Sequence, residues 1–131
     1  MTPTASLTER IPIIICEDDE ELRSILVVGL RYFGIDACGV GDGVALDTAL
    51  AADRATVVVL DIGLPGEDGL AITRRLSASR PSVVGIILLT ARGAVDDRIE
   101  GIRSGADAYF VKPVDLRELA SAVQNLHRQL R

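Results

Sequence analysis

Acidic residues follow two apolar stretches of this chain at the point where each stretch ends. Glu17 and Asp18 come directly after the first apolar run, and Asp61 follows the β-branched run 57–60. The segment 62–66, with two glycines and a proline, then excludes regular structure, so Asp61 is expected to end a buried strand. Open α/β sheets carry their chemistry at the carboxyl ends of strands. An Asp at such a place can also simply begin a turn, so the other strand ends decide between the two interpretations.

Two further strand ends carry polar side chains that suit the same chemistry. Thr90 ends one apolar run, and Lys112 follows another. Carboxylates that lie close together repel one another unless they share a cation, and oxygen ligands at this density suit Mg²⁺. A metal ion, a lysine and a hydroxyl around one carboxylate are what a transferring phosphoryl group requires. We therefore expect Mg²⁺ at this edge, with Asp61 as the group that attacks phosphorus.

The elements that must position these residues alternate regularly along the chain. Five strand-length apolar runs alternate with five segments of helical periodicity. The expected strands cover 11–16, 35–40, 56–61, 83–90 and 108–111. The expected helices cover 22–33, 42–52, 68–79, 95–104 and 115–129. In the first and fourth of these helices, Ile25, Ile99 and Ile102 are expected to face the core.

This alternation predicts an α/β fold, a flavodoxin-like, doubly wound (βα)5 arrangement with a five-stranded parallel sheet in the order 2-1-3-4-5. In that order the strands that end at Glu17 and Asp61 are neighbours. We expect one domain over residues 11–131, preceded by a flexible lead over residues 1–10.

Composition narrows the class of protein further. The formal net charge of −5 makes the domain a poor ligand for nucleic acid, because phosphate neutralisation needs Lys and Arg. Cys16 and Cys38 both lie in apolar stretches and are expected to be buried thiols in a reducing compartment. No apolar run approaches the length of a membrane span, and residues 1–10 lack a signal pattern. A cytoplasmic protein without membrane contact is expected.

Four motifs together resemble the receiver domain of two-component response regulators, over about residues 11–130. Each motif is weak alone, but all four occur in order and at strand ends. They are Ile-Ile-Ile-Cys-Glu17-Asp18-Asp19, Val-Val-Leu-Asp61-Ile-Gly-Leu-Pro65-Gly-Glu-Asp68-Gly69, Leu-Leu-Thr90-Ala91-Arg92 and Gly105-Ala106-Asp107-Ala-Tyr109-Phe-Val-Lys112-Pro113.

The resemblance implies a phosphoacceptor and a metal site. Asp61 is expected to receive a phosphoryl group from a partner histidine kinase and to form an acyl phosphate. Asp18 is expected to bind Mg²⁺ directly and Glu17 to hold it through water, with the backbone carbonyl of Gly63 as a further ligand. The domain is then no enzyme in the usual sense, since it assists only its own phosphorylation and dephosphorylation.

The resemblance also implies residues that contact the phosphoryl group and respond to it. Thr90 and Lys112 are expected to contact the phosphoryl oxygens, and the peptide between Lys112 and Pro113 is expected to be cis. Tyr109 is expected to act as a switch that turns inward as Thr90 moves toward the phosphate. A passive strand-end Thr90, a solvated Lys112 and a half-buried core Tyr109 are the simpler alternatives.

The segment 97–107 resembles the OmpR-like class of receivers, which form dimers and control a winged-helix DNA-binding domain. We expect the face of helix 95–104, strand 108–111 and helix 115–129 to change on phosphorylation and to mediate a homodimer. Ala108 and Ala122 depart from the pattern of that class. We further expect this chain to be a receiver cut from a longer protein rather than a single-domain regulator, so that DNA is bound only through an output domain absent from this chain.

Three rival functions fit these residues less well. A flavin-binding domain needs a phosphate-cradling loop where Glu17-Asp18-Asp19 stands. An aspartate-nucleophile phosphatase needs a second acid at the position of Gly63. An interaction module without phosphorylation would not need the complete set of site residues found here. Outside the site, Asp19 and Asp68 are expected to cap helices, and His127 to be solvated or to face a helix dipole.

Overall fold

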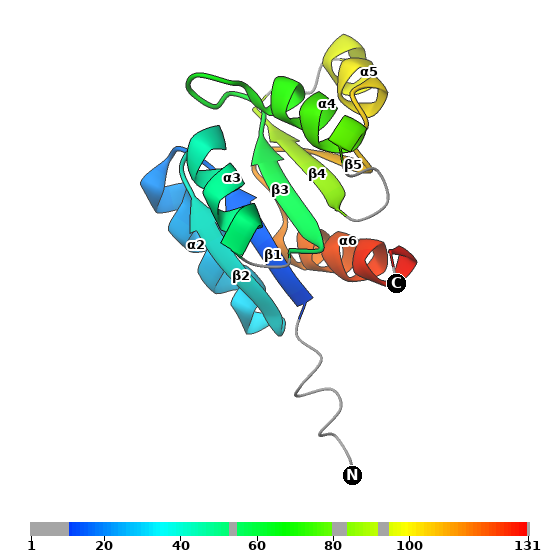
Figure 1. Cartoon of the computed structure of the whole chain (residues 1–131). Helices are drawn as coiled ribbons and strands as arrows, with labels where there is room; N and C mark the ends of the chain where they lie inside the picture. Colours follow the sequence, from blue (N-terminus) through cyan, green and yellow to red (C-terminus); the bar gives the residue numbers. More distant parts are fainter. Residues whose placement is uncertain (1–10, 53–54, 80–83, 92–94, 131) are drawn as a thin grey trace.

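A sheet of five parallel strands forms the centre of the molecule (Figure 1). The computed structural model describes residues 11–52, 55–79, 84–91 and 95–130. The strands are β1 (Ile11–Cys16), β2 (Ile35–Val40), β3 (Val57–Asp61), β4 (Gly85–Thr90) and β5 (Ala108–Val111). The helices are α2 (Glu20–Tyr32), α3 (Gly43–Ala52), α4 (Gly69–Ser79), α5 (Val95–Arg103) and α6 (Leu116–Gln129). The strand order is β2-β1-β3-β4-β5, which confirms the predicted fold.

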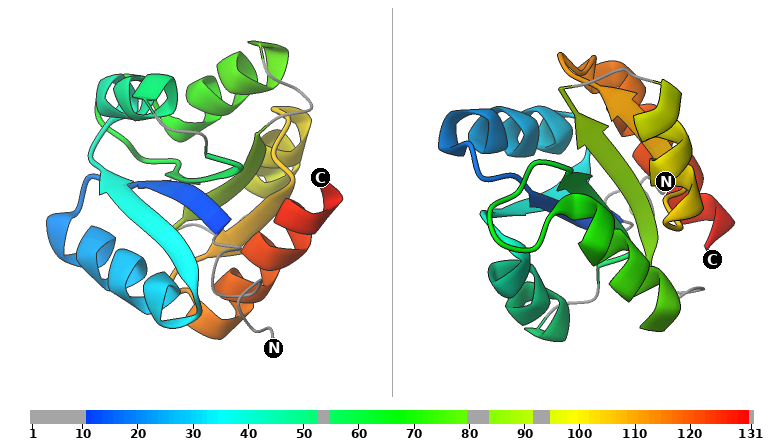
Figure 2. Two further views of the ribbon diagram at one scale, coloured as in Figure 1. Left: turned by 60° about the horizontal axis from the view of Figure 1, so that its bottom comes forward. Right: turned by 90° about the horizontal axis from the view of Figure 1, so that it is seen from above.

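The central strands are buried on both faces because helices cover both sides of the sheet. Alternate residues of β1, β3 and β4 enter two separate apolar clusters, as the two-residue period of a strand requires. Val57 and Val59 pack with residues of α2 and α6, whereas Val58 and Leu60 pack with residues of α3 and α4. Figure 2 shows α2 and α6 together on one face and α3 and α4 on the other. The near-continuous apolar runs of these strands follow from this double cover.

Side-chain caps explain where two of the helices begin. The Asp19 carboxylate accepts a hydrogen bond from the Leu22 amide at 3.1 Å and caps α2, as predicted. Asp115 caps α6 through the amides of Arg117 and Glu118. These caps fix the helix starts that follow β1 and β5, at the edge of the sheet where the acidic residues lie.

Three predicted core residues are exposed, and those predictions were wrong. Ile25 of α2 and Ile99 and Ile102 of α5 have exposed fractions of 51%, 46% and 51%. For α5 the cause is the orientation of the helix. Gly101 faces inward, and a Cβ atom built there would lie 2.8 Å from Cδ2 of Tyr109. The close approach at Gly101 turns the two isoleucines outward.

Cys16 is fully buried, whereas Cys38 is exposed on β2, so the prediction of two buried thiols holds only for Cys16. Asp36 and Cys38 share one face of the edge strand β2, and both are exposed there. The lead over residues 1–10, Val83 and Arg92 lie outside the described residues. Among the described helices, none is both long and apolar enough to cross a bilayer.

Candidate functional site

Four strand ends bring the predicted site residues to one edge of the sheet. The register pairs Cys16 with Leu60, so that Glu17 and Asp61 follow adjacent positions on β1 and β3. On the other side β3 pairs with β4, and Thr90 at the end of β4 pairs with Val111 of β5. Residues far apart in the sequence therefore converge because parallel strands end at the same edge.

Three carboxylates lie close enough to share one cation. Glu17, Asp18 and Asp61 each offer an oxygen, and these atoms all lie within 4.8 Å of one another. Glu17 and Asp61 are buried, with exposed fractions of 1% and 7%, whereas Asp18 is exposed. Hard oxygen donors in this number and spacing fit a divalent ion that keeps some of its water. The acidic cluster of Glu17, Asp18 and Asp61 could thus hold a divalent metal ion.

Lys112 places its ammonium group between the two buried carboxylates. Its Nζ atom lies 2.8 Å from Oε1 of Glu17 and 3.1 Å from Oδ1 of Asp61. The Lys112 side chain therefore reaches from the end of β5, past the end of β4, to Asp61 at the end of β3 and Glu17 after β1. It offsets part of the negative charge that burial would otherwise leave uncompensated.

Burial and ion pairing shift the pKa values of Glu17 and Lys112. Burial raises the pKa of Glu17 above its ordinary value, although the hydrogen bonds from Lys112 and from the Asp19 amide act in the opposite direction. Burial lowers the pKa of Lys112, but its bonds to Glu17 and Asp61 outweigh that effect and leave the pKa raised. Lys112 therefore carries its positive charge throughout the physiological pH range. Burial also raises the pKa of the Cys16 thiol to about 12, which keeps it neutral.

A pocket of about 330 Å³ opens beside Asp61. It is lined by Asp61, Ile62, Gly63, Leu70, Thr90, Ala91 and Lys112. The pocket thus presents a carboxylate, a hydroxyl-bearing residue and a cation to a single space, while Leu70 and Ile62 form its apolar wall. A tetrahedral anion bound here would contact a positive charge next to a potential nucleophile.

Tyr109 lies apart from this pocket. It is half-buried on β5, packs against the α3–α4 side of the sheet and approaches α5 at Gly101. The peptide between Lys112 and Pro113 is cis. Asp68 caps the start of α4 through the Ala71 amide at 2.8 Å, as predicted.

His127 lies far from the acidic cluster. It is half-buried in the last turn of α6, where its Nδ1 atom is 3.0 Å from Oγ1 of Thr56. Thr56 precedes β3, at the opposite end of that strand from Asp61. The contact gives His127 a structural partner and no route to the site.

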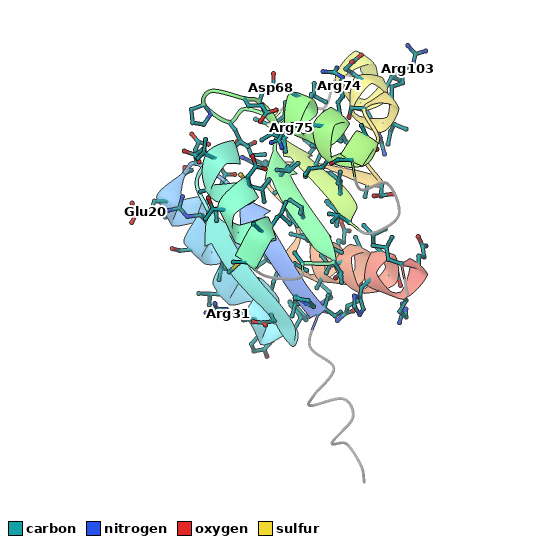
Figure 3. The ribbon with its side chains drawn as sticks, viewed as in Figure 1. Glu20, Arg31, Asp68, Arg74, Arg75 and Arg103 are labelled. Atoms are coloured by element: carbon teal, nitrogen blue, oxygen red, sulfur yellow. The ribbon has the colours of Figure 1, made fainter. Side chains whose placement is uncertain are left out.

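An ion-pair cluster of Asp47, Glu67 and Arg75 connects the loop between β3 and α4 to helices α3 and α4. Arg75 of α4 donates two parallel hydrogen bonds to Glu67, at 3.0 and 2.9 Å, and a third to Asp47 of α3 at 3.1 Å. Figure 3 labels Arg75 and Asp68 near this loop. This cluster could not be predicted from the sequence, because nothing in the spacing of Asp47, Glu67 and Arg75 indicates that they meet.

Comparison with known proteins places the chain in a family. The model of the response regulator receiver domain matches residues 13–124. The chain belongs to this family, which confirms the resemblance seen in the sequence. A receiver domain is a phosphoacceptor that works with histidine kinases, not an enzyme that turns over a separate substrate.

Two characterised relatives illustrate the similarity. The chain is 44% identical over 117 residues to the response regulator protein PmrA of Pseudomonas aeruginosa, covering 89% of this chain and 52% of PmrA. It is 39% identical over 117 residues to the transcriptional regulatory protein TctD of Salmonella typhimurium, covering 89% of this chain and 52% of TctD. The chain spans about half the length of these relatives.

Solved structures show the same fold. The receiver domain of the Francisella response regulator 1452 superposes with a TM-score of 0.87 at 24% identity, covering 93% of this chain and 100% of that domain. The BeF3-activated DrrB receiver domain superposes with a TM-score of 0.79 at 26% identity, covering 91% of this chain and 98% of that domain.

Proposed function

We propose that Asp61 accepts a phosphoryl group from the phosphohistidine of a partner histidine kinase, in the presence of Mg²⁺. The observation that carries this proposal is the environment of Asp61. Its carboxylate belongs to the acidic cluster, lies 3.1 Å from the Lys112 ammonium and borders an open pocket. A buried carboxylate with a cation beside it and free space in front of it suits a nucleophile.

The proposed step balances as a simple displacement. An Asp61 carboxylate oxygen forms a bond to phosphorus, while the bond between phosphorus and the donor's imidazole nitrogen breaks and the nitrogen keeps its electron pair. Mg²⁺, held by Asp18, Asp61 and the Gly63 carbonyl and through water by Glu17, would supply positive charge to the phosphoryl oxygens. Lys112 adds a second positive charge on the pocket side, and Thr90 contributes its hydroxyl.

The phosphoryl group would act as a switch because it adds roughly −1.5 to −2 charge at neutral pH. Thr90 borders the pocket, and Tyr109 lies on the adjacent strand β5 against α5. We propose that a shift of Thr90 toward the phosphoryl group changes the packing of Tyr109 and so alters the face formed by α5, β5 and α6.

We propose that the same face forms a homodimer, as in the OmpR-like class. Ile99 and Ile102 are exposed on α5 and Val111 is exposed on β5, so the face combines apolar side chains with charges. Arg98, Arg103, Asp107, Arg117 and Glu118 supply the charges. Asp107 already has one partner within the chain, because its Oδ2 atom accepts a hydrogen bond from the Ile86 amide at 2.8 Å.

We propose that the domain controls transcription where it is joined to an output domain, and not by itself. TctD, of which this chain covers about half, is named as a transcriptional regulatory protein. With a formal net charge of −5, this domain has no charge-based attraction for DNA. DNA binding would belong to an output domain, and the cytoplasmic location expected from the sequence stays a prediction.

Intact-mass spectrometry after incubation with acetyl phosphate tests the proposal. The wild type with Mg²⁺ is expected to gain the mass of one phosphoryl group, whereas Asp61→Ala and the wild type with a chelator are expected to gain none. Asp68→Ala, which alters an exposed helix cap, is the matched control and should be modified normally. A wild type that gains no phosphoryl group, or an Asp61→Ala variant that still gains one, would contradict the proposal.

A further inference from the structure

Arg23 of α2 occupies a slot between the helix and the end of β2 that two glycines leave open. A Cβ atom at Gly39 would lie 2.8 Å from the Cγ atom of Arg23, and one at Gly41 would lie 3.2 Å from its Nη1 atom. The arginine stem therefore lies flat against the backbone of β2. At the end of the slot, Nη1 donates a hydrogen bond to the backbone carbonyl of Glu17 at 2.9 Å.

The hydrogen bond from Arg23 is one of several that hold Glu17 in place. The Glu17 amide donates to the Val40 carbonyl at 3.0 Å, which ties it to β2. One carboxylate oxygen of Glu17 accepts from Lys112 and the other accepts from the Asp19 amide. With the Arg23 bond, the amide, the carbonyl and both carboxylate oxygens of Glu17 each have a partner.

The geometry points to Arg23 as a positioning residue for the metal site. We propose that Arg23, through the Glu17 carbonyl, sets the backbone direction from which the Glu17 and Asp18 side chains enter the acidic cluster. This inference rests on the proposed function of that cluster as a Mg²⁺ site. Contacts one step removed from the metal orient the ligands, and losing one costs 10- to 100-fold in metal affinity in characterised sites.

Arg31 provides a matched comparison on the same helix. Its Nε atom donates to the Ala37 carbonyl of β2 at 2.9 Å, so it makes the same kind of bond between α2 and β2. Arg31 lies two turns further along α2, away from the acidic cluster, and is labelled in Figure 3. If these arginines only fasten the helix to the strand, replacing either should have the same consequences. If Arg23 positions Glu17, only Arg23 should affect metal binding.

The glycine slot allows a test that leaves the charge of the protein unchanged. Gly39→Ala places a methyl group where the Arg23 stem lies and should displace the guanidinium from Glu17. Arg23→Met keeps an apolar stem in the slot but removes the donor. Arg23→Ala removes the guanidinium, so that Gly39→Ala in the same chain meets only Cγ2 of Val27, at 3.2 Å, and has no bond to Glu17 left to break.

Mg²⁺ affinity is measured by isothermal titration calorimetry, and thermal unfolding in chelator reports stability separately. We expect Arg23→Met and Gly39→Ala to weaken Mg²⁺ binding by about 10-fold. Arg23→Lys should recover part of that loss, because it retains a donor. Arg31→Met should lower the unfolding temperature as Arg23→Met does, yet bind Mg²⁺ like the wild type. Adding Gly39→Ala to Arg23→Ala should weaken binding no further.

The outcomes separate this inference from the function on which it rests. Wild-type protein that binds Mg²⁺ while Arg23→Met and Gly39→Ala bind it equally well would overturn the role of Arg23 and leave the metal site standing. Equal losses of affinity in Arg23→Met and Arg31→Met would also overturn it, because the effect would then be a general loosening of α2. Wild-type protein that binds no Mg²⁺ would overturn both.

Discussion

Lys112 shows how one side chain can stabilise the site and serve its chemistry. Its ammonium group contacts both buried carboxylates of the acidic cluster, Glu17 and Asp61. Removing one partner of a buried ion pair leaves the other charge uncompensated, which usually costs more than the pair itself contributes. The same position at the pocket lets Lys112 face an incoming phosphoryl group.

The first prediction concerns replacement of this lysine. Lys112→Met keeps a similar shape but removes the charge, and the free energy of unfolding in chelator should fall by about 1–3 kcal/mol. Mg²⁺ should restore part of this loss, because the ion supplies the missing positive charge. Phosphorylation by acetyl phosphate should nevertheless be slow. A variant that is phosphorylated at the wild-type rate would exclude a role for Lys112 in the transfer step.

The raised pKa of Glu17 gives the second prediction. Because the folded protein holds a proton on Glu17 more tightly than the unfolded chain does, this group favours folding at low pH. Its contribution is lost as the pH rises from the ordinary value of about 4.5 through the raised folded value. Denaturant unfolding in chelator should show this loss in the wild type and not in Glu17→Gln. Mg²⁺ should reduce the loss, since it stabilises the ionised carboxylate. Parallel pH profiles for the two proteins would contradict the assignment.

Among the elements, the loop between β3 and α4 matters most for the site, because it carries Gly63 past Asp61. Arg75 of α4 donates two hydrogen bonds to Glu67 of this loop and one to Asp47 of α3. All three side chains are exposed, so each pair contributes little alone. Their value lies in joining α3, the loop and α4.

The third prediction tests this ion-pair cluster. Arg75→Met should lower the free energy of unfolding by about 0.5–1 kcal/mol, and high salt should reduce the difference. In a double-mutant cycle, Arg75→Met and Glu67→Gln should be less than additive, because they remove the same contact. Arg74→Met, which removes an ion pair with Glu100 of α5, is the control and should add fully to Glu67→Gln. Full additivity of Arg75→Met and Glu67→Gln would show that the contact contributes nothing in solution.

The elements also show what the sequence could and could not predict. The strands and their order followed from apolar runs and connection rules, because burial on both faces leaves a clear pattern. The site residues followed from the same pattern, since strand ends meet at one edge. The rotation of α5 did not follow, because an isoleucine at helical spacing does not reveal that Gly101 takes the inner position. The Arg23 contact was also not predicted, although Gly39 near the end of β2 and Gly41 just after it were a usable signal.

At the scale of the whole molecule, the exposed isoleucines of α5 bear on assembly. An apolar patch on a face that also carries both signs of charge suits a two-fold interface. Ile99 and Ile102, which were expected in the core, are thus candidates for the dimer contact.

The fourth prediction concerns this assembly. With Mg²⁺ and beryllofluoride, a mimic of the phosphoryl group, the wild type should sediment as a dimer in analytical ultracentrifugation. Ile102→Glu should remain a monomer, and its stability should change by no more than about 0.5 kcal/mol, because the side chain is exposed. Val44→Glu, at an exposed position on α3, is the control and should still dimerise. A wild type that stays monomeric at high concentration would count against the dimer.

The most direct test of the central claim is to locate the phosphoryl group. Borohydride reduces an acyl phosphate of aspartate to homoserine, so phosphorylation followed by reduction and peptide mass spectrometry marks the modified residue. We predict homoserine at position 61 alone, formed with Mg²⁺ and absent with chelator. Homoserine at Asp18 or at any other aspartate, or at no position, would contradict the assignment of Asp61 as the phosphoacceptor.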